Sequence, residues 1–406
     1  MKRVSVSRGV ILMTIGLYIL TITLFLGRHF AYAEDVRGVT EDTIKIGIIA
    51  DLTGPTAVDI AAPVVAGLKL LYLYTNEQGG INGRKIKLII EDDRFNIPLA
   101  LSAFKKLVFK EKVFAICGPL QVGGSVALMG QIAKNKVPQI NYGPSKKYLF
   151  PVQRYIFSCV GIYDDDIKLI FEYIFEKMKE KPSIVGIVYP DLETGKTALR
   201  ASLVEANRYG IQLYEEILNV GATDATSQVL NLKRKKVRHI IIHEPPMGVV
   251  TVLRAAYRLG LSAGYYGTVL STSEDDIEMG GPAIENFIGS HLYSAWYEDT
   301  PGTMKLRELS RKYLKKVTTI RSRFSSGGFL GGMILNEGIK NAGRDLNHET
   351  LVERLESIKN WDTQDISGPV TYNAANHQGI YHRKLYKVDR DKKILVPISG
   401  WLKSKY

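Results

Sequence analysis

The chain has 406 residues, which exceeds one typical domain and is compatible with two. Apolar residues make up 45% of the sequence, which is enough for buried cores and argues against a disordered or fibrous protein. The formal net charge is +13, but the basic residues are spread along the chain, so nucleic acid is not the predicted partner.

The N-terminus has the pattern of a secretory signal peptide. Basic residues precede an apolar run from Val10 to Leu26, and a small-x-small site ends at Ala33. This pattern predicts cleavage after Ala33 and export to the periplasm or the cell exterior. The alternative is an uncleaved membrane anchor, because the apolar run is close to spanning length.

Apolar strands and periodic helices alternate along the rest of the chain. The first strand is predicted at Ile44–Ala50, and the first helix follows at Val64–Thr75 and ends before Gly79-Gly80. Further strands are predicted at residues 85–91, 113–117, 138–141, 154–159, 184–189, 211–218, 239–243 and 266–270. Further helices are predicted at residues 99–112, 125–135, 164–179, 197–209, 226–235, 248–259, 303–313, 328–341 and 350–359.

Two such series predict an α/β protein with two Rossmann-like lobes, each built on a parallel sheet covered on both faces. In open α/β sheets, ligands bind beyond the carboxyl ends of the strands. Two lobes that face each other form a cleft that closes by hinge motion. The candidate binding turns are those after Ala50, Cys117, Ile140, Tyr189, Ile242 and Leu270.

The glycine-rich segment 118–125 follows a predicted strand and opens a helix, but it matches neither a phosphate loop nor a dinucleotide motif. Its free backbone N–H groups could hold an anion such as a carboxylate. The alternative is that the glycines only ease a tight turn between strand and helix. The sequence does not decide between these roles.

No metal site is predicted. His239 and His243 are four residues apart, a spacing that suits a helical metal pair, but their segment is β-like and carries no acidic ligand in a recognised spacing. His243 is instead predicted as a strand residue at the mouth of the cleft. For Cys117 and Cys159, a disulfide and two buried free thiols remain open, because the sequence gives no distance between them.

Catalytic motifs are also missing from the sequence. There is no nucleophile elbow, and neither cysteine has the local signature of a nucleophile. Acidic pairs and runs such as Asp92-Asp93 and Asp164–Asp166 occur in turns or at helix starts, where capping explains them. We therefore predict a binding protein without a cofactor rather than an enzyme.

Several short segments, taken together and in this order, resemble one family. They are residues 38–47, 53–55, 79–83, 91–93, 115–118 and 368–372. The chain is similar to the leucine/isoleucine/valine-type (branched-chain amino-acid-type) extracellular solute-binding proteins of ATP-binding-cassette (ABC) transporters, which have the type I periplasmic-binding fold. The likeness covers almost the whole chain after the signal peptide.

The resemblance implies a two-lobed, monomeric protein that captures a small molecule and presents it to a membrane permease. Lobe one is expected at residues 40–159 and 291–370, and lobe two at residues 160–290 and 371–406, with three crossing segments between them. The alternatives are a ligand-sensing protein that feeds a receptor or regulator, and an exported α/β enzyme.

The resemblance also assigns ligand-binding positions. They are Thr53, Asp59, Gln121, Val122, Gly123, Tyr142, Gly143, Ser145, Thr194, His243 and Val269. Backbone groups at residues 122–124 and Ser145 are expected to position a polar end of the ligand. Tyr142 would cover an apolar part or pack within its loop.

Two departures from the family's pattern bear on the ligand. Val122 stands where amino-acid-binding members place a hydroxyl for the α-carboxylate, and Val269 stands where they place an acidic partner for the α-ammonium. If the alignment slips, Glu274, Asp275 or Asp276 would replace Val269. We therefore expect a carboxylate or another solute rather than a standard α-amino acid.

We expect protein recovered from the cell envelope to have the mass of a chain that begins at Glu34, because cleavage follows the small-x-small site. Intact-mass spectrometry of the purified protein tests this. Recovery of the full-length chain in the membrane fraction would show an uncleaved anchor instead.

Overall fold

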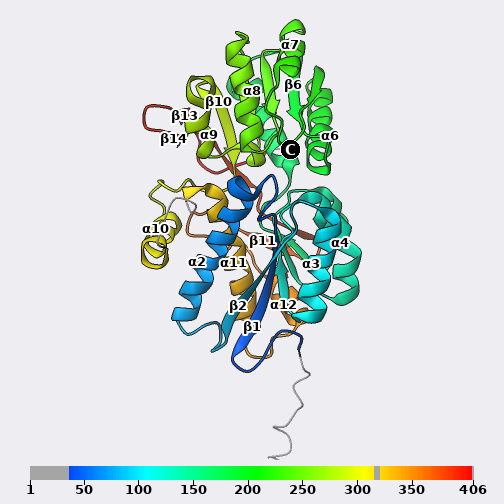
Figure 1. Ribbon diagram of the computed structural model, residues 1–406, viewed down its shortest axis with the longest axis vertical. Helices are drawn as coiled ribbons and strands as arrows, with labels where there is room; N and C mark the ends of the chain where they lie inside the picture. The colour runs from blue at the N-terminus through cyan, green and yellow to red at the C-terminus, as the bar shows by residue number, and fades with distance from the viewer. Residues whose placement is uncertain (1–35, 315–320, 405–406) are drawn as a thin grey trace, which may run out of the picture. The chain divides into compact units, whose positions relative to one another are not determined.

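The computed structural model describes residues 36–314 and 321–404, and it places most strands in two sheets, one in each lobe of Figure 1. The predicted signal peptide, residues 1–33, lies outside the described residues. The prediction of an α/β fold with two sheets rich in parallel strands is confirmed.

The first sheet is parallel and has the strand order β2-β1-β3-β4-β5. Its strands are β1 (Thr43–Ala50), β2 (Lys85–Asp92), β3 (Ala115–Cys117), β4 (Gln139–Asn141) and β5 (Ile156–Ser158). The helices of this lobe are α2 (Ala62–Glu77), α3 (Ile97–Lys105), α4 (Val122–Asn135), α10 (Pro301–Tyr313), α11 (Arg323–Ala342) and α12 (His348–Glu356). A short hairpin, β11 (Thr371–Asn373) and β12 (Asn376–Gly379), completes it.

The second sheet has the order β14-β13-β10-β9-β8-β6-β7, with β15 paired to β13. Its strands are β6 (Ile184–Tyr189), β7 (Gln212–Ile217), β8 (His239–Ile242), β9 (Gly264–Gly267), β10 (Phe287–His291), β13 (His382–Asp389), β14 (Ile394–Pro397) and β15 (Leu402–Lys403). Its helices are α5 (Tyr163–Glu172), α6 (Glu193–Arg208), α7 (Thr226–Arg234), α8 (Pro246–Arg258) and α9 (Asp275–Gly280). The strands β13, β14 and β15 run antiparallel to their partners.

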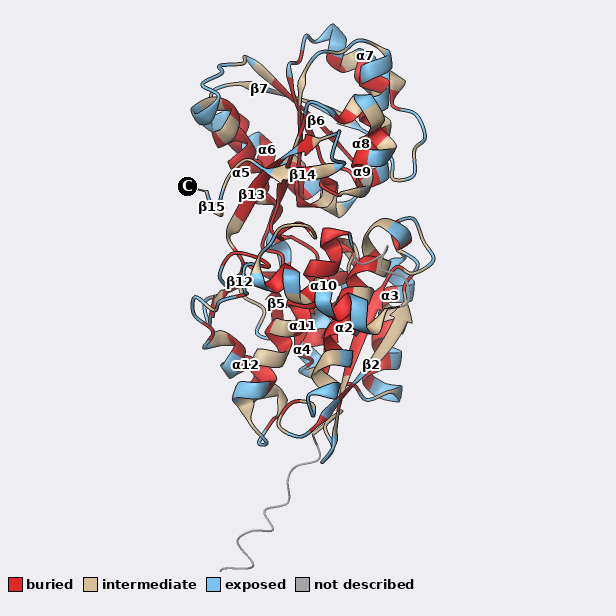
Figure 2. Cartoon of the chain, turned by 90° about the vertical axis from the view of Figure 1, so that its left-hand side faces the viewer, coloured by how far each residue is buried: buried red, intermediate tan, exposed pale blue. Residues whose placement is uncertain are grey.

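Strand β8 shows why these strands are continuous apolar runs. Ile240 and Ile242 belong to the core under α7 and α8, whereas Ile241 belongs to the core under α5 and α6. A strand covered on both faces has no solvent side, so it needs no polar alternation. Strands in the middle of the sheets are largely red in Figure 2, whereas the outer strands β2 and β7 are only partly buried.

Several predicted element boundaries were wrong. Helix α6 begins at Glu193 rather than at residue 197. Helix α4 begins at Val122 rather than at residue 125, and α11 begins at Arg323 rather than at residue 328. The strand predicted to reach residue 270 ends at Gly267, and a 3-10 turn follows at Val269–Ser271. Glycines at the starts of α4 and α11 obscured the boundaries, because glycine is a poor helix former unless tertiary packing supports it.

In the described part of the chain, the path crosses between the sheets three times: after β5, after β10 and after β12. The buried guanidinium of Arg383 donates to the backbone oxygens of Val160 (3.4 Å) and Ile162 (3.1 Å), which lie in the first crossing, and to the carboxylate of Asp166 (3.2 Å). Ser290 of β10 donates to the same carboxylate at 2.8 Å. These bonds join all three crossings at one point.

The hairpin β11–β12 belongs with the first lobe. Strand β12 lies beside β5, and β11 lies beside α12 (Figure 2). We therefore propose that the third crossing begins near residue 380, ten residues later than the resemblance implied, and that the remaining lobe boundaries, 40–159, 160–290 and the start at 291, are kept.

Helices α2 and α11 pack with their backbones in direct contact. A Cβ added to Gly328 of α11 would overlap the backbone oxygen of Val64, and one added to Gly67 of α2 would overlap the backbone oxygen of Ser325. The helical segment Ala57–Glu77 is long and apolar enough to span a membrane, but here it is a core helix of the first lobe. Its apolar character is therefore explained by packing against α11.

The structure answers the question that the sequence left open for the two cysteines. Cys117 and Cys159 are both buried and both free, so they form no disulfide. Burial raises the pKa of Cys117 to about 12, which keeps that thiol protonated and unreactive at neutral pH.

Replacing Gly328 with alanine should destabilise the protein, because the added methyl has no space between the two helices. Overpacked substitutions cost roughly 1–3 kcal/mol, and urea unfolding measures the loss. The matched control is Gly130→Ala on the exposed side of α4, where nothing lies within 4 Å of an added Cβ. That change should be neutral or should stabilise by up to about 1 kcal/mol. Equal effects of the two changes would contradict the proposed backbone contact.

Candidate functional site

A cavity lies between the two lobes, at the carboxyl ends of their strands. Its empty volume is about 870 Å³, which includes space open to solvent. The first lobe contributes apolar lining from Ile60, Val64, Phe95, Leu120 and Phe324. The second lobe and the first crossing contribute Val160, Pro190, Leu192, Val220, Pro245 and Leu270. Walls of this kind favour a ligand with an apolar body.

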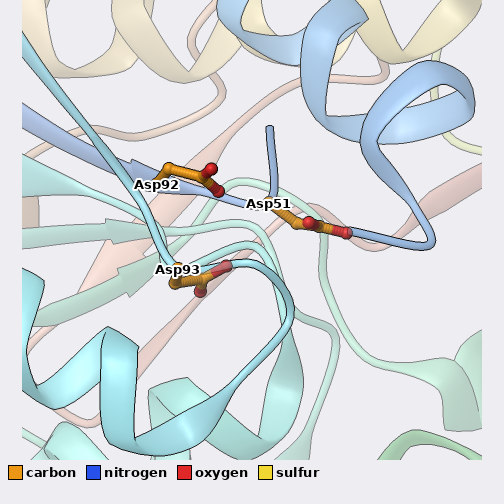
Figure 3. Close-up of side chains that lie close together, drawn as sticks. All are labelled: Asp51, Asp92 and Asp93. Carbon is orange, nitrogen blue, oxygen red and sulfur yellow. The ribbon is translucent and has the colours of Figure 1, made fainter. Parts of the chain in front are cut away.

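Three carboxylates lie together at the edge of the first sheet: Asp51 after β1, and Asp92 and Asp93 at the end of β2 (Figure 3). One oxygen from each lies within 4.8 Å of the others. Asp51 accepts hydrogen bonds from the backbone N–H of Gly54 (2.6 Å) and from both the N–H and the hydroxyl of Thr56 (2.8 Å each). Both of its oxygens are therefore occupied by the turn that follows β1.

The other two carboxylates are occupied in the same way. Asp92 accepts from the N–H of Leu52 (2.9 Å) and from the hydroxyl of Thr53 (2.6 Å), and Asp93 accepts from the amide of Gln121 (2.9 Å). Burial alone would raise the pKa of Asp92, but these hydrogen bonds outweigh it and lower the value. Burial raises the pKa of Asp93, although Gln121 donates to its carboxylate. Through these hydrogen bonds the cluster shapes the loops of the first lobe.

Five of the predicted ligand-binding residues line the cavity: Gln121, Val122, Tyr142, Thr194 and Val269. They come from turns after β3, β4, β6 and β9, as expected for an open α/β sheet. Val269 is almost fully buried and offers only an aliphatic side chain. The role of these residues as ligand contacts remains a prediction.

The other predicted residues lie near the cavity without lining it. Thr53 holds Asp92, as described above, and Asp59 lies in a π-helical turn before α2. Gly123 lies within α4, and the N–H of Gly143 donates to Asn141 at 2.6 Å. The hydroxyl of Ser145 accepts from the N–H of Lys147 at 3.3 Å and caps a 3-10 turn, a role that accounts for this side chain without a ligand.

His243 lies behind the cavity wall rather than at its mouth. Its side chain is fully buried, and its Nε2 atom lies 3.1 Å from the hydroxyl oxygen of Thr194, which does line the cavity. Its Nδ1 atom lies 2.8 Å from the hydroxyl oxygen of Thr268. Burial lowers the pKa of His243 to about 3, so the imidazole is neutral at physiological pH.

Two helices begin at the cavity, α4 at Val122 and α6 at Glu193 (Figure 1). Neither N-cap residue, Gln121 or Leu192, provides a side-chain cap. The first N–H groups of each helix therefore lack helical partners and carry the positive end of the helix dipole. One such helix end comes from each lobe.

Of the three acidic residues considered as substitutes for Val269, Glu274 already has a partner. Glu274 of the second lobe accepts a hydrogen bond of 2.8 Å from Arg323, the first residue of α11 in the first lobe. The guanidinium of Arg323 is fully buried and lies over the ring of Tyr386, 4.1 Å from its centroid. Burial opposes the charge of Arg323, but Glu274 outweighs it and raises the pKa.

Sequence reasoning missed several lining residues, among them Asp51, Tyr163, Tyr293 and Phe324. Asp51 directly follows the first strand, so the rule that ligands bind beyond strand ends pointed to its turn but not to its side chain. The two tyrosines and Phe324 lie at or near crossings or helix starts, and no local pattern marks them as neighbours. Only the path of the chain between the lobes brings them together.

Comparisons with known proteins agree with this architecture. A family model described as "Periplasmic binding protein" matches residues 43–393. A curated relative, Leu/Ile/Val-binding protein homolog 1 of Brucella melitensis, is 26% identical over 274 residues, which cover 66% of this chain and 72% of the relative.

Two solved structures share the fold. A branched chain amino acid ABC transporter protein from Thermus thermophilus with bound valine has a TM-score of 0.84 at 22% identity, over 90% of this chain and 98% of that chain. A fatty acid ABC transporter substrate-binding protein from Thermomonospora curvata has a TM-score of 0.80 at 24% identity, over 92% and 95% of the two chains. The type I periplasmic-binding fold is thereby confirmed.

One buried carboxyl group near the cavity has no partner. Glu244 follows His243 and is fully buried, and neither of its carboxyl oxygens has a hydrogen-bond partner among the described residues. Burial raises the pKa of Glu244 from its usual value near 4.5 to about 9. The native protein therefore keeps this proton at neutral pH, while the unfolded chain releases it.

Replacing Glu244 with glutamine should stabilise the protein at neutral and alkaline pH. Because the folded pKa is raised, the wild type loses stability as the pH rises from about 4.5 to about 9. At 1.36 kcal/mol per pKa unit, the loss avoided at pH 7 is about 3 kcal/mol, and denaturant unfolding between about pH 5 and about pH 9 measures it. The control is Glu353→Gln, on an exposed part of α12, which should leave the pH profile unchanged. Parallel profiles for wild type and Glu244→Gln would contradict the assignment.

Proposed function

This chain belongs to the periplasmic binding protein family, and from that premise we propose that it is an exported solute-binding protein that delivers its ligand to an ABC importer. The observation that carries the proposal is the apolar cavity, because both lobes line it and a bound molecule would hold them together. The family consists of solute-binding proteins rather than enzymes, in line with the lack of a catalytic motif in the sequence. The predicted cleavage after Ala33 would release the protein from the membrane.

The ligand we propose has an apolar body and no ammonium group. Val269 stands where amino-acid-binding members of the family are expected to place an acidic partner, and the nearby Glu274 is held by Arg323. Asp51 lines the cavity, but both of its oxygens accept hydrogen bonds from its own loop. The carboxylate that an ammonium ion would meet in the lining, Asp51, is therefore already occupied, and burial of an unpaired ammonium is costly.

A carboxylate is the polar group that the cavity suits best. The uncapped ends of α4 and α6 meet the cavity from opposite lobes, and free N–H groups at helix ends favour an anion. The printed name of the Thermomonospora curvata protein says that it serves fatty acid transport, which is the same combination of apolar body and carboxylate. The curated relative is named for leucine, isoleucine and valine. In this chain, Val269 and the ion pair of Glu274 with Arg323 argue against that ligand class.

Calorimetry with matched solutes tests the ligand class. We expect aliphatic and aromatic carboxylates without an amino group to bind, and leucine, isoleucine and valine to bind at least a hundredfold more weakly. A buried, unpaired ammonium costs roughly 3–5 kcal/mol, and each 1.4 kcal/mol corresponds to a factor of ten. The sharpest pair is 4-methylpentanoate against leucine, because the two differ only in the α-ammonium. Micromolar binding of leucine or valine would contradict the proposed ligand class and leave the transport role intact.

A further inference from the structure

Hydroxyl groups in the cavity wall differ in whether their protons are already used. Thr56 donates to Asp51, and Tyr142 and Tyr293 donate to backbone oxygens at 3.4 Å and 3.3 Å. The other lining hydroxyls among the described residues are those of Thr194 and Tyr163. Of this pair, Thr194 also contacts a buried histidine, at Nε2 of His243.

A chain of hydrogen bonds runs from this pair into the core of the second lobe. Thr194 contacts Nε2 of His243 at 3.1 Å, and Nδ1 of His243 contacts the hydroxyl of Thr268 at 2.8 Å. The hydroxyl of Thr268 lies 3.3 Å from that of Ser271, and Ser271 accepts from the backbone N–H of Glu244 at 3.0 Å. His243, Thr268 and Ser271 are fully buried.

The backbone N–H at the buried end of this series of hydrogen bonds fixes which group donates and which accepts in each of them. A backbone N–H can only donate, so the oxygen of Ser271 accepts from Glu244 and its own proton needs another acceptor. The oxygen of Thr268 is that acceptor, and the proton of Thr268 then goes to Nδ1 of His243. A neutral imidazole that accepts at Nδ1 carries its proton at Nε2, so His243 donates to Thr194.

The opposite direction leaves a buried donor without a partner. If Nδ1 of His243 carried the proton, Thr268 would donate to Ser271, and Ser271 would accept two hydrogen bonds. Its own hydroxyl proton would then face no acceptor, which is unfavourable in a fully buried side chain. The lowered pKa of His243 agrees with a neutral ring that has only one N–H.

The tautomer of His243 decides whether Thr194 can donate to a ligand. Thr194 has one hydroxyl proton, and its hydroxyl contacts Nε2 of His243. Because His243 donates to Thr194 rather than accepting from it, the proton of Thr194 remains for an acceptor in the cavity. In the opposite tautomer, His243 would take this proton, and the hydroxyl of Thr194 would offer only lone pairs.

We infer that Thr194 is a specificity-determining residue that donates a hydrogen bond to an acceptor oxygen of the ligand, and that His243 is the positioning residue that leaves the proton of Thr194 free to do so. The inference rests on the proposed function and deepens it. It places the carboxylate of the ligand beside the second lobe, at the start of α6. It also adds a second reason for the exclusion of ammonium, since an ammonium group would meet a donor.

Affinity measurements with one pair of probes test the role of Thr194. In calorimetry with protein recovered from the cell envelope, octanoate should bind and octylamine should not. Thr194→Val should weaken octanoate binding roughly tenfold to a hundredfold, as expected for a hydrogen bond to a charged group. Thr194→Ser keeps the hydroxyl and should stay within about threefold of the wild type. Equal octanoate affinity in wild type and Thr194→Val, at similar melting temperatures, would overturn the inference.

The tautomer of His243 provides a readout that needs no ligand. Nitrogen NMR of protein with ring-labelled histidine should show the His243 proton at Nε2. In Thr268→Val, which removes the donor to Nδ1 of His243 and leaves the lining side chains intact, this preference should weaken, and so should the discrimination between octanoate and octylamine. A proton at Nδ1 in the wild type would overturn the inference even if carboxylates bind. A proton at Nε2 without binding of any carboxylate would instead contradict the proposed ligand class, and the assigned role of Thr194 with it.

Discussion

The buried guanidinium of Arg383 holds together the segments by which the chain passes between its two sheets. It binds the first crossing through the oxygens of Val160 and Ile162, and it reaches the second through Asp166 and Ser290. A buried ion pair gains little over an apolar replacement, but removal of one partner leaves an uncompensated charge in the core. These contacts fix the place where the three crossings meet beside the cleft, and the ion pair of Arg323 with Glu274 adds a second buried link between the lobes.

The loops of the first lobe are fixed before any ligand arrives. Asp51, Asp92 and Asp93 accept hydrogen bonds from the turns after β1 and β2 and from Gln121 (Figure 3). Such loops lose little conformational freedom on binding, so the contacts with a ligand are not spent on ordering the protein. In the second lobe, the hydrogen bonds that link Thr194 to His243, Thr268 and Ser271 are also formed before a ligand binds. They fix the direction in which Thr194 donates its proton. The two walls thus differ in kind: one has its polar groups satisfied internally, and the other retains a donor.

The sequence predicts best where a pattern is local. The run Ile44–Ala50 and the strands like it are continuous apolar segments, so two α/β lobes followed from their alternation with helices. The strand at residues 382–389 was missed, because polar residues interrupt its apolar ones and it lies in the antiparallel part of the sheet. Thr194 was found through a family resemblance, whereas Tyr163 was not, since its place in the cavity depends on the crossing before it. The hydrogen-bond direction at His243 has no signal in the sequence at all.

The close helix packing at Gly67 and Gly328 sets more than the stability of the first lobe. Val64, whose backbone oxygen meets Gly328, lines the cavity, and so does Gly327 beside it. The distance between the two helices is therefore also the width of one cavity wall, and it is fixed by backbone atoms rather than by side chains. The spacing of these helices therefore limits the size of the solute that fits against this wall. Substitutions in the surrounding loops can change which solutes bind, but the helix spacing changes only if one of these glycines is replaced.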